Sequence, residues 1–537
     1  MSFKGFEFGS DADFGHATFW NGADFSHAHF KEKAYFNAGS FNYLPVDFSF
    51  ALFDGPAYFG GRQFEVLADF RSATFGAQSF FGGCKFTYGA DFRGSSFAAI
   101  AYFAGVHFHG YAWFSSVTFG VPGGPANFDA AFRSRPKPKD SKDDSLSEDS
   151  LLRMDLRADF SGANFHSQTS FRDATFNLPT DFLRVNKNTE NKTEKTEFVS
   201  AVFNAEVRFQ DAIFPAMADF SYARFNESAA DFSSAGFGPS NFSHALFKVS
   251  SDFRLASFNE PADFSNTTFA GQTDFRAAQF KSTANLSSVL IESYLRFAGA
   301  NGKQSFGSES SLDLQFATIE KPECVSFHTL TLRPVWFVNV DARAFSFTNV
   351  DWDWRNINDE IEHLRTKAIS TPHRLMAIAY RHLAVNAEDN HQYEDASRFR
   401  YLAMDARRLD GWRGFTPWRL SWWYWLASGY GERMLRAFLV ILAIWLVAGL
   451  LYTRVGFARW EPRTATESDV VTATRDNVGA ALSFSRALTY SAGVMTLQRP
   501  EPRPATTAAQ TLVLLETILG PVQAALLALA IRRKFMR

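Results

Sequence analysis

The sequence predicts a mainly β protein, in which a four-sided parallel β-solenoid is followed by a short α-helical neck and an α-helical membrane hairpin. The first observation is an excess of phenylalanine: 61 of the 537 residues are Phe, and they recur at steps that alternate between five and six residues. The second is a pair of long apolar stretches near the C-terminus, each bounded by arginine. A chain of this length exceeds one ordinary core, so several domains are expected.

The phenylalanine repeat has a unit of eleven residues, which reads A-D-F-x-x-A-x-F-x-x-x. An alanine usually stands two positions before each Phe, as Ala17 does before Phe19. Residues i−2 and i share a face of extended backbone, so we expect Ala and Phe to point inward and the residue between them outward. Steps of five and six match no helical period. Four such sides make a coil of about 22 residues in which Phe stacks on Phe at about 4.8 Å, and roughly eleven coils fit between Phe3 and Phe280.

This repeat resembles the pentapeptide-repeat family in its Phe-rich form, and the resemblance extends over roughly residues 3–350. The resemblance implies a right-handed quadrilateral parallel β-helix, which we assign to residues 1–355. A shared fold does not define a function, so the resemblance leaves the role of the solenoid open.

Two stretches interrupt the repeat. Residues 133–157 are charged, contain Ser and Pro and lack Phe, and residues 186–196 form a shorter polar stretch. Both are interpreted as surface insertions. A docking or modification loop at 133–157 is the alternative.

After Phe280 the repeat loosens, and leucines are expected at inward positions: Leu286, Leu290 and Leu295. Larger aromatic residues follow and are expected to cap the last open coil, as a solenoid requires: Trp336, Trp352 and Trp354.

Residues 356–411 predict a helical neck. Thr371 before Pro372 is typical of a helix start, with the Thr hydroxyl as the cap, and a second helix is expected over 393–409. The facing apolar stripes of this hairpin are expected from Tyr380, Leu383, Tyr393, Ala396, Phe399 and Leu402. The neck is similar to the tetratricopeptide-like segments that join such solenoids to membrane segments, but one hairpin is too short for a peptide-binding array.

The C-terminal part predicts an interfacial segment and two membrane spans. Residues 412–433 are rich in Trp and Tyr, which prefer the headgroup boundary. Residues 434–454 and 505–531 are apolar and long enough to span when flanking arginines snorkel. Basic residues flank the two spans on the predicted cytoplasmic side, whereas the loop between the spans balances its basic residues with acidic ones. MSFKGFEFGS has no signal-peptide pattern. We therefore expect a multi-pass protein of the bacterial inner membrane with both termini cytoplasmic.

Between the spans, residues 477–500 contain an amphipathic helix-length segment that ends in small residues. The order of span, re-entrant helix and span is similar to pentapeptide-repeat proteins that carry a two-transmembrane potassium-channel-like domain. That resemblance implies that backbone carbonyls of a filter replace the hydration shell of an ion. The filter positions correspond to Thr489, Tyr490, Ser491, Ala492, Gly493 and Val494.

The sequence departs from the family filter, which reads T-x-G-Y-G. Gly493, Val494 and Met495 stand where G-Y-G belongs, so the second glycine is missing, and Arg486 adds positive charge to the pore-like helix. Glu516 is an intramembrane carboxylate and is expected to face a partner or water. Gly520 and Pro521 form a predicted hinge in the second span.

These features predict an integral membrane protein with a cytosolic solenoid that conducts ions of undefined selectivity, as a homo-oligomer that is a tetramer if it is a channel. The alternative is a membrane-anchored protein-interaction scaffold without conduction, in which the solenoid binds a protein partner. A third hypothesis is a gyrase-binding DNA mimic, which requires a strongly acidic face. The net charge of −2 argues against nucleic-acid binding. No catalytic motif, metal-ligand spacing or cofactor signature occurs in the sequence, so neither an enzyme nor a cofactor is expected.

Overall fold

The computed structural model consists of two compact units, Met1–Trp354 and Arg355–Arg537, and each unit is described by itself. The residues that the structure describes are 1–119, 126–129, 157–187, 195–300, 304–366, 369–410, 419–458 and 481–535.

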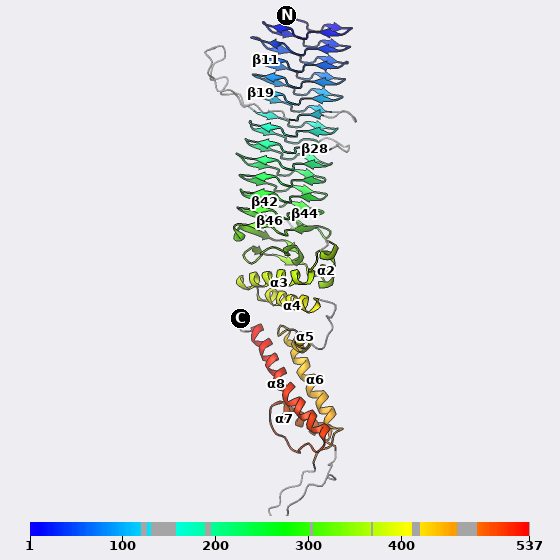
Figure 1. Ribbon diagram of the computed structural model, residues 1–537, viewed down its shortest axis with the longest axis vertical. Coiled ribbons are helices and arrows are strands. Elements are labelled where there is room, and N and C mark those ends of the chain that lie inside the picture. Colours follow the sequence, from blue (N-terminus) through cyan, green and yellow to red (C-terminus); the bar gives the residue numbers. More distant parts are fainter. Residues whose placement is uncertain are drawn as a thin grey trace, which may run out of the picture. The chain divides into compact units, whose positions relative to one another are not determined.

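The first unit is a parallel β-solenoid of about 14 turns, which confirms the predicted fold class. Figure 1 shows its short strands stacked coil on coil. Two faces are continuous: a 14-stranded sheet runs from β4 (Ala23–Asp24) to β51 (Ser346–Thr348), and a 13-stranded sheet runs from β2 (Ala12–Asp13) to β47 (Ser311–Asp313). Most strands are two residues long, because each side of the coil ends at a turn.

The other two faces are each divided into two sheets. One consists of seven strands from β1 (Glu7–Phe8) to β24 (Asn164–Phe165) and four strands from β31 (Ile213–Phe214) to β43 (Gln279–Phe280). The other consists of five strands from β3 (Thr18–Phe19) to β19 (His107–Phe108) and seven from β26 (Thr175–Phe176) to β48 (Thr318–Ile319).

Phenylalanine rings fill the interior as predicted. Phe70 and Phe92 stack one coil apart with ring centroids 4.7 Å apart and an interplanar angle of 2°. Rings from opposite sides of a coil meet edge to face, as Phe81 and Phe92 do at 5.4 Å and 90°. Phe92 is completely buried. Offset stacking along the axis and T-shaped contacts across it are the arrangements that aromatic quadrupoles favour.

The outward aspartates are turn residues. The Asp24 carboxylate accepts a hydrogen bond from the Ser26 backbone N–H (2.9 Å), and Asp69 accepts one from Arg71 (3.0 Å). A short polar side chain that bonds the backbone two residues on stabilises a tight turn. The same bond recurs at other corners, where Asp47 accepts from the Ser49 N–H (2.7 Å) and Asp91 from the Arg93 N–H (3.1 Å). Tyr35 and Tyr58 stand at equivalent positions, so Asp stabilises the corner without being required for it.

One buried position departs from the repeat. Arg62 occupies an inward position normally held by alanine and is completely buried. Its Nη1 donates to the carbonyls of Phe14 (3.2 Å), Phe36 (3.1 Å) and Ala38 (2.7 Å), and its guanidinium lies 4.2 Å from the Phe41 ring centroid. Burial lowers the pKa of Arg62 to about 10.

Gly39 stands one coil earlier at the position equivalent to Arg62. Gly39 has φ +75°, and a Cβ there would lie 2.4 Å from the Ala17 carbonyl oxygen. In ordinary coils the residue three places after Phe donates to that Phe carbonyl, as Ala28 does to Phe25 (3.0 Å). Around Phe36 the Arg62 side chain supplies a donor instead.

The break between β24 and β31 is bridged by Asn186, which is 1% exposed. Its Oδ1 accepts from the Phe165 backbone N–H (2.6 Å), and its Nδ2 donates to the Ile213 carbonyl (3.1 Å). The side-chain amide therefore takes the place of a peptide group in the ladder. The polar insertion predicted at 186–196 begins at this buried residue, which is structural; residues 188–194 lie outside the described part.

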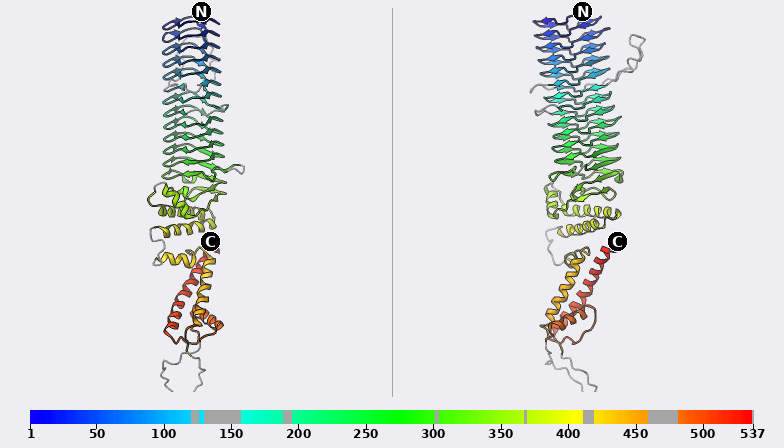
Figure 2. Two further views of the ribbon diagram at one scale, coloured as in Figure 1. Left: turned by 90° about the vertical axis from the view of Figure 1, so that its right-hand side faces the viewer. Right: turned by 180° about the vertical axis from the view of Figure 1, so that it is seen from behind.

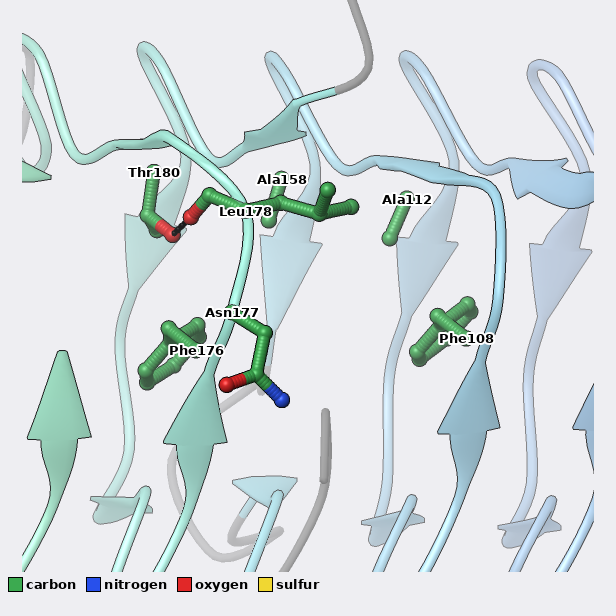
Figure 3. Close-up of a pocket in the computed structure, with 7 residues that line it drawn as sticks. All are labelled: Phe108, Ala112, Ala158, Phe176, Asn177, Leu178 and Thr180. Atoms are coloured by element: carbon green, nitrogen blue, oxygen red, sulfur yellow. Dashed lines mark hydrogen bonds between the residues drawn. The ribbon is translucent and has the colours of Figure 1, made fainter. Parts of the chain in front are cut away.

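The break between β19 and β26 coincides with the insertion predicted at 133–157, of which 133–156 lie outside the described residues. A cavity of about 10 Å³ is lined by the residues labelled in Figure 3: Phe108, Ala112, Ala158, Phe176, Asn177, Leu178 and Thr180. A cavity of this size barely holds one water molecule, so it is too small for a larger ligand.

After Phe280 the solenoid continues with a mixed core. Leu286 and Leu295 are completely buried, as predicted. The prediction for Leu290 is wrong: it is partly exposed and pairs with outward Thr268, while Ile291 stacks in the Phe269 column. The error arose because β45 (Leu290–Ile291) places its second residue inward.

The closing coils contain β50 (Thr331–Leu332), β52 (Asp351–Trp352) and two short 3-10 helices, Pro322–Cys324 and Pro334–Phe337. Trp336 packs on Phe306 at 5.1 Å, and Trp352 packs on Phe347 at 5.4 Å. Both indoles are buried, which agrees with the predicted aromatic cap.

The second unit is helical. Its helices are α2 (Ile357–Thr366), α3 (Pro372–Asp389), α4 (Tyr393–Leu409), α5 (Leu420–Ser428), α6 (Met434–Tyr452), α7 (Phe484–Met495) and α8 (Thr507–Phe535). Figure 2 shows α6 (amber) and α8 (red) running side by side, and the two helices contact each other.

The neck hairpin α3–α4 buries Tyr380 against Phe399, with ring centroids 6.3 Å apart. Two details of its prediction are wrong. Thr371 makes no capping hydrogen bond, although Pro372 does begin the helix. Tyr393 is 38% exposed because it points outward at the first position of α4. Its hydroxyl oxygen lies 2.9 Å from His391 Nδ1.

Two helices are long and apolar enough to cross a membrane. Met434–Tyr452 has a mean hydropathy of 2.5, and Thr507–Arg533 has 2.0. Only 17% of each apolar window is buried within the chain, so most of both surfaces is available to lipid. These are the two candidate spans.

Candidate site at the centre of the membrane hairpin

The candidate site is centred on Glu516, near the middle of α8. The side chain is 2% exposed. The Tyr452 hydroxyl donates to Glu516 Oε2 at 2.6 Å, and the Ser491 hydroxyl donates to Oε1. Both carboxylate oxygens are therefore held by the same chain, one from α6 and one from α7.

Hydrogen bonds of Trp445 fix α7 against α6 beside this carboxylate. Its indole Nε1 donates to the Leu488 carbonyl (3.0 Å), and its own carbonyl lies 3.3 Å from Ser491 Oγ. Gly449 permits the close approach, because a Cβ there would lie 2.6 Å from Leu488 Cδ2.

An apolar cluster covers the carboxylate and its two donors. Its buried members are Ala448, Tyr452, Phe457, Ala487, Tyr490 and Val494. The Tyr490 ring lies 5.0 Å from Tyr452 and 4.9 Å from Phe457, both edge to face. A buried polar group is tolerated where it is hydrogen-bonded, and Glu516 meets this condition through Tyr452 and Ser491.

The six residues predicted as a filter all lie within helix α7: Thr489, Tyr490, Ser491, Ala492, Gly493 and Val494. The Gly493 carbonyl accepts from the Gln498 N–H (2.9 Å) and from Thr496 Oγ1 (3.1 Å), and the Val494 carbonyl accepts from the Leu497 N–H (3.0 Å). A selectivity filter needs carbonyls that face an ion instead. The filter assignment stays a prediction.

Gly520 and Pro521 lie within α8, which runs through both residues. A Cβ on Gly520 would meet Met495 at 3.1 Å, so the glycine permits close packing of α8 against the end of α7. Proline removes one backbone donor from the helix. Movement at this pair stays a prediction.

Sequence reasoning found Glu516 but missed its donor Tyr452 and a second buried polar residue, Gln523. Gln523 is 3% exposed, and its Nε2 donates to the carbonyls of Ala427 (2.7 Å) and Ala437 (2.9 Å). A polar side chain inside an apolar span is itself a signal of an interhelical contact, and both residues carry that signal.

On the solenoid, several outward aspartates are paired with arginine two residues later. Arg71 donates from Nε and Nη2 to Asp69 (3.0 and 2.6 Å), and Arg254 pairs with Asp252 in the same way. These hydrogen bonds raise the pKa of both arginines. The equivalent pairs are Arg93–Asp91, Arg276–Asp274 and Arg343–Asp341. Within the described ranges, no group of three or more His, Cys, Asp or Glu side chains could hold a metal ion.

Comparison with known proteins identifies the repeat. Residues 253–301 match a family model described as pentapeptide repeats (9 copies). No curated protein and no solved structure matches the chain. The matched segment has the same coil geometry as the rest of the solenoid, since its strands continue the registers of the preceding coils.

Proposed function

Because the first unit is a pentapeptide-repeat β-solenoid and the second carries two candidate membrane spans, we propose that this chain is a membrane-anchored protein-interaction scaffold. The observation that carries this proposal is the closed environment of Glu516. Tyr452 and Ser491 satisfy both carboxylate oxygens inside one chain, so the carboxylate joins α6, α7 and α8 into one anchor and is not directed at an ion path.

The geometry of α7 supports anchoring in preference to conduction. Its filter-position carbonyls at Gly493 and Val494 accept hydrogen bonds from the chain's own N–H groups. Carbonyls that are engaged in this way do not replace the hydration shell of an ion. The hairpin holds the solenoid at the bacterial inner membrane, with the solenoid and both termini in the cytoplasm.

The solenoid surface supports protein binding in preference to DNA mimicry. A DNA mimic presents unpaired negative charge, whereas Asp69 and Asp252 each form a two-point ion pair with an arginine. The outer face carries these paired charges together with a stacked aromatic column of Tyr35, Tyr58 and Phe80, a combination that suits a protein partner.

The first test is ion flux across vesicles that contain the purified full-length protein. The scaffold predicts potassium and chloride flux within about twofold of protein-free vesicles, while the protein resists alkaline extraction from membranes. Flux about tenfold above that background, and changed by Glu516→Gln, would overturn the scaffold.

The second test addresses the solenoid. Crosslinking in cells compares partner capture by the original chain with capture by the double variant Arg254→Glu and Arg276→Glu. The comparison tests whether capture depends on this stretch of the outer face. Loss of capture supports the scaffold when Glu516→Gln captures normally. If the double variant, Glu516→Gln and a chain that lacks the solenoid all capture the partner equally, the scaffold proposal is contradicted.

Ion conduction is the second candidate, because α7 lies between the spans in the sequence and contacts both α6 and α8. It requires a homo-oligomer, a tetramer for a four-fold pore, with α7 rearranged so that its carbonyls become free. A stable tetramer in detergent, measured by light scattering, together with flux favours this candidate. A monomer leaves no closed ring of α7 segments.

A further inference from the structure

One face of helix α5 is exposed. Leu420 is 85% exposed, Trp423 53% and Leu426 40%. They are spaced three residues apart and therefore lie along one side of the helix. Large apolar side chains in a row that expose this much of their surface mark a contact surface.

The opposite face of α5 is fixed to the neck helix α4. Trp425 Nε1 donates to the Tyr401 hydroxyl at 3.2 Å. The Trp425 ring also contacts two guanidinium groups, those of Arg408 (4.6 Å to the ring centroid) and Arg436 (5.1 Å). These cation–π contacts and the hydrogen bond fix which side of α5 faces outward.

The turn after α5 ties the neck to both spans. Glu432 Oε2 accepts from Ser397 Oγ of α4 (2.7 Å), and Glu432 Oε1 accepts from Arg533 Nη1 at the end of α8 (3.0 Å). Gly431 has φ +75°, and a Cβ there would lie 3.0 Å from the Tyr424 hydroxyl oxygen, so a larger residue would be strained and crowded in this turn.

The position of α5 relative to the spans follows from Gln523. Its single Nε2 group reaches the carbonyl of Ala427, in the last turn of α5, and that of Ala437, in the first turn of α6. The end of α5 therefore lies level with the beginning of the first span. The first turns of α6 also expose large apolar side chains: Leu435 is 67%, Phe438 50% and Leu439 52% exposed.

We infer that α5 lies in the headgroup region of the bilayer, with Leu420, Trp423 and Leu426 against lipid, and that it holds the neck helix α4 at the membrane surface. This inference rests on the proposed insertion of α6 and α8. The occupant is lipid because Gln523 places the end of α5 beside the first turn of the apolar helix α6, and because Trp prefers the headgroup boundary. Exposed Arg419 and Arg433 flank the helix and match anionic headgroups.

The test places nitroxide labels on the full-length protein in vesicles of phosphatidylcholine and phosphatidylglycerol, in a Cys324→Ser background; Cys84 is completely buried and stays. Labels at Trp423→Cys and Leu426→Cys probe the exposed face. Leu439→Cys is the control within the span, and Gln392→Cys, in the exposed α3–α4 turn, is the aqueous control. Frequent collision of the nitroxide with oxygen, which concentrates in lipid, indicates a label in the bilayer. Frequent collision with a water-soluble nickel chelate indicates a label in water.

The expected oxygen-to-nickel collision ratio at 423 and 426 is about threefold or more above that at 392, and below that at 439. If 439 is in lipid while 423 and 426 match 392, the inference is overturned and the anchor stands. If the labels at 423 and 426 are shielded from both oxygen and the nickel chelate, protein covers this face of α5, and the inference is also overturned. If 439 itself is aqueous, the anchor and the inference fail together.

Discussion

The Phe92→Ala substitution measures how much stability the aromatic stack provides. Phe92 is completely buried, stacks on Phe70 (4.7 Å) and Phe114 (4.9 Å), and meets Phe81 and Phe103 edge to face (5.4 and 5.5 Å). Truncating a buried Phe to Ala costs about 3–5 kcal/mol. Four well-oriented ring contacts are lost with it, so about 4 kcal/mol or more is expected here.

Because each coil contacts only its neighbours, this loss appears first as local opening around the substituted coil. Hydrogen exchange followed by mass spectrometry on the full-length protein resolves that opening. A loss of about 4 kcal/mol accelerates exchange roughly a thousandfold in peptides covering residues 70–114, since about 1.4 kcal/mol is a factor of ten.

The matched control is Phe50→Ala. Phe50 is 56% exposed and stacks outward on His27 at 4.9 Å. Its truncation is expected to cost less than about 1 kcal/mol, which is less than about fivefold in exchange. If the two variants exchange within about tenfold of each other, the stacked interior does not carry the stability assigned to it.

Four further outcomes are expected. Gly39→Ala destabilises the first coils by about 2 kcal/mol or more, because the new Cβ would lie 2.4 Å from the Ala17 carbonyl and its φ is +75°; exchange in residues 14–64 checks this. Asn186→Ala leaves the Phe165 N–H and the Ile213 carbonyl without this partner and costs about 1–3 kcal/mol, whereas an exposed Asn349→Ala changes the unfolding midpoint little. Burial raises the pKa of the Cys84 thiol from 9.0 to about 12. The unfolded chain therefore loses the thiol proton at a lower pH than the folded protein, and the folded state loses stability as the pH rises above the pKa of the unfolded chain. Between about pH 8 and about pH 10.5 the protein therefore loses about 2 kcal/mol relative to Cys84→Ala, in denaturant unfolding. Tyr452→Phe removes one donor from Glu516 and lowers the thermal midpoint in detergent, and unaltered midpoints for this variant and for Ser491→Ala would contradict a structural role of the carboxylate.

The coil architecture was predictable because each of its causes is local. The five-and-six spacing of Phe, the alanine two positions before it and the aspartate between them define the inward and outward faces without any long-range information. Thus Ala28 and Phe30 are buried, and Asp24 accepts the backbone N–H two residues on. At Leu290 the same reasoning failed, because adjacent Val289, Leu290 and Ile291 are all apolar and the alternation no longer marks the register.

The contacts between distant residues were not predictable. Asn186 looks like the start of a polar loop, and only the neighbouring coils reveal that its amide completes a ladder. Arg62 resembles a surface residue in the sequence, although it is completely buried. In the second candidate span, the cost of a carboxylate among apolar residues pointed to Glu516, but its partner Tyr452 is 64 residues away and no periodicity links them.

The pairing of Gly39 with Arg62 limits how this solenoid can be shortened, lengthened or recombined. Most coils are interchangeable modules, since each presents Phe and Ala to identical neighbours. Gly39 and Arg62 occupy equivalent positions in successive coils, and Arg62 donates to the Phe36 and Ala38 carbonyls of the coil that contains Gly39. If the coil of Gly39 alone is replaced by an ordinary coil, an alanine is placed against the Ala17 carbonyl. If the coil of Arg62 alone is moved elsewhere, its guanidinium lacks the carbonyl acceptors that it has here. Lineages that duplicate or delete coils must carry these two together, which makes the pair a fixed reference point for aligning the repeats.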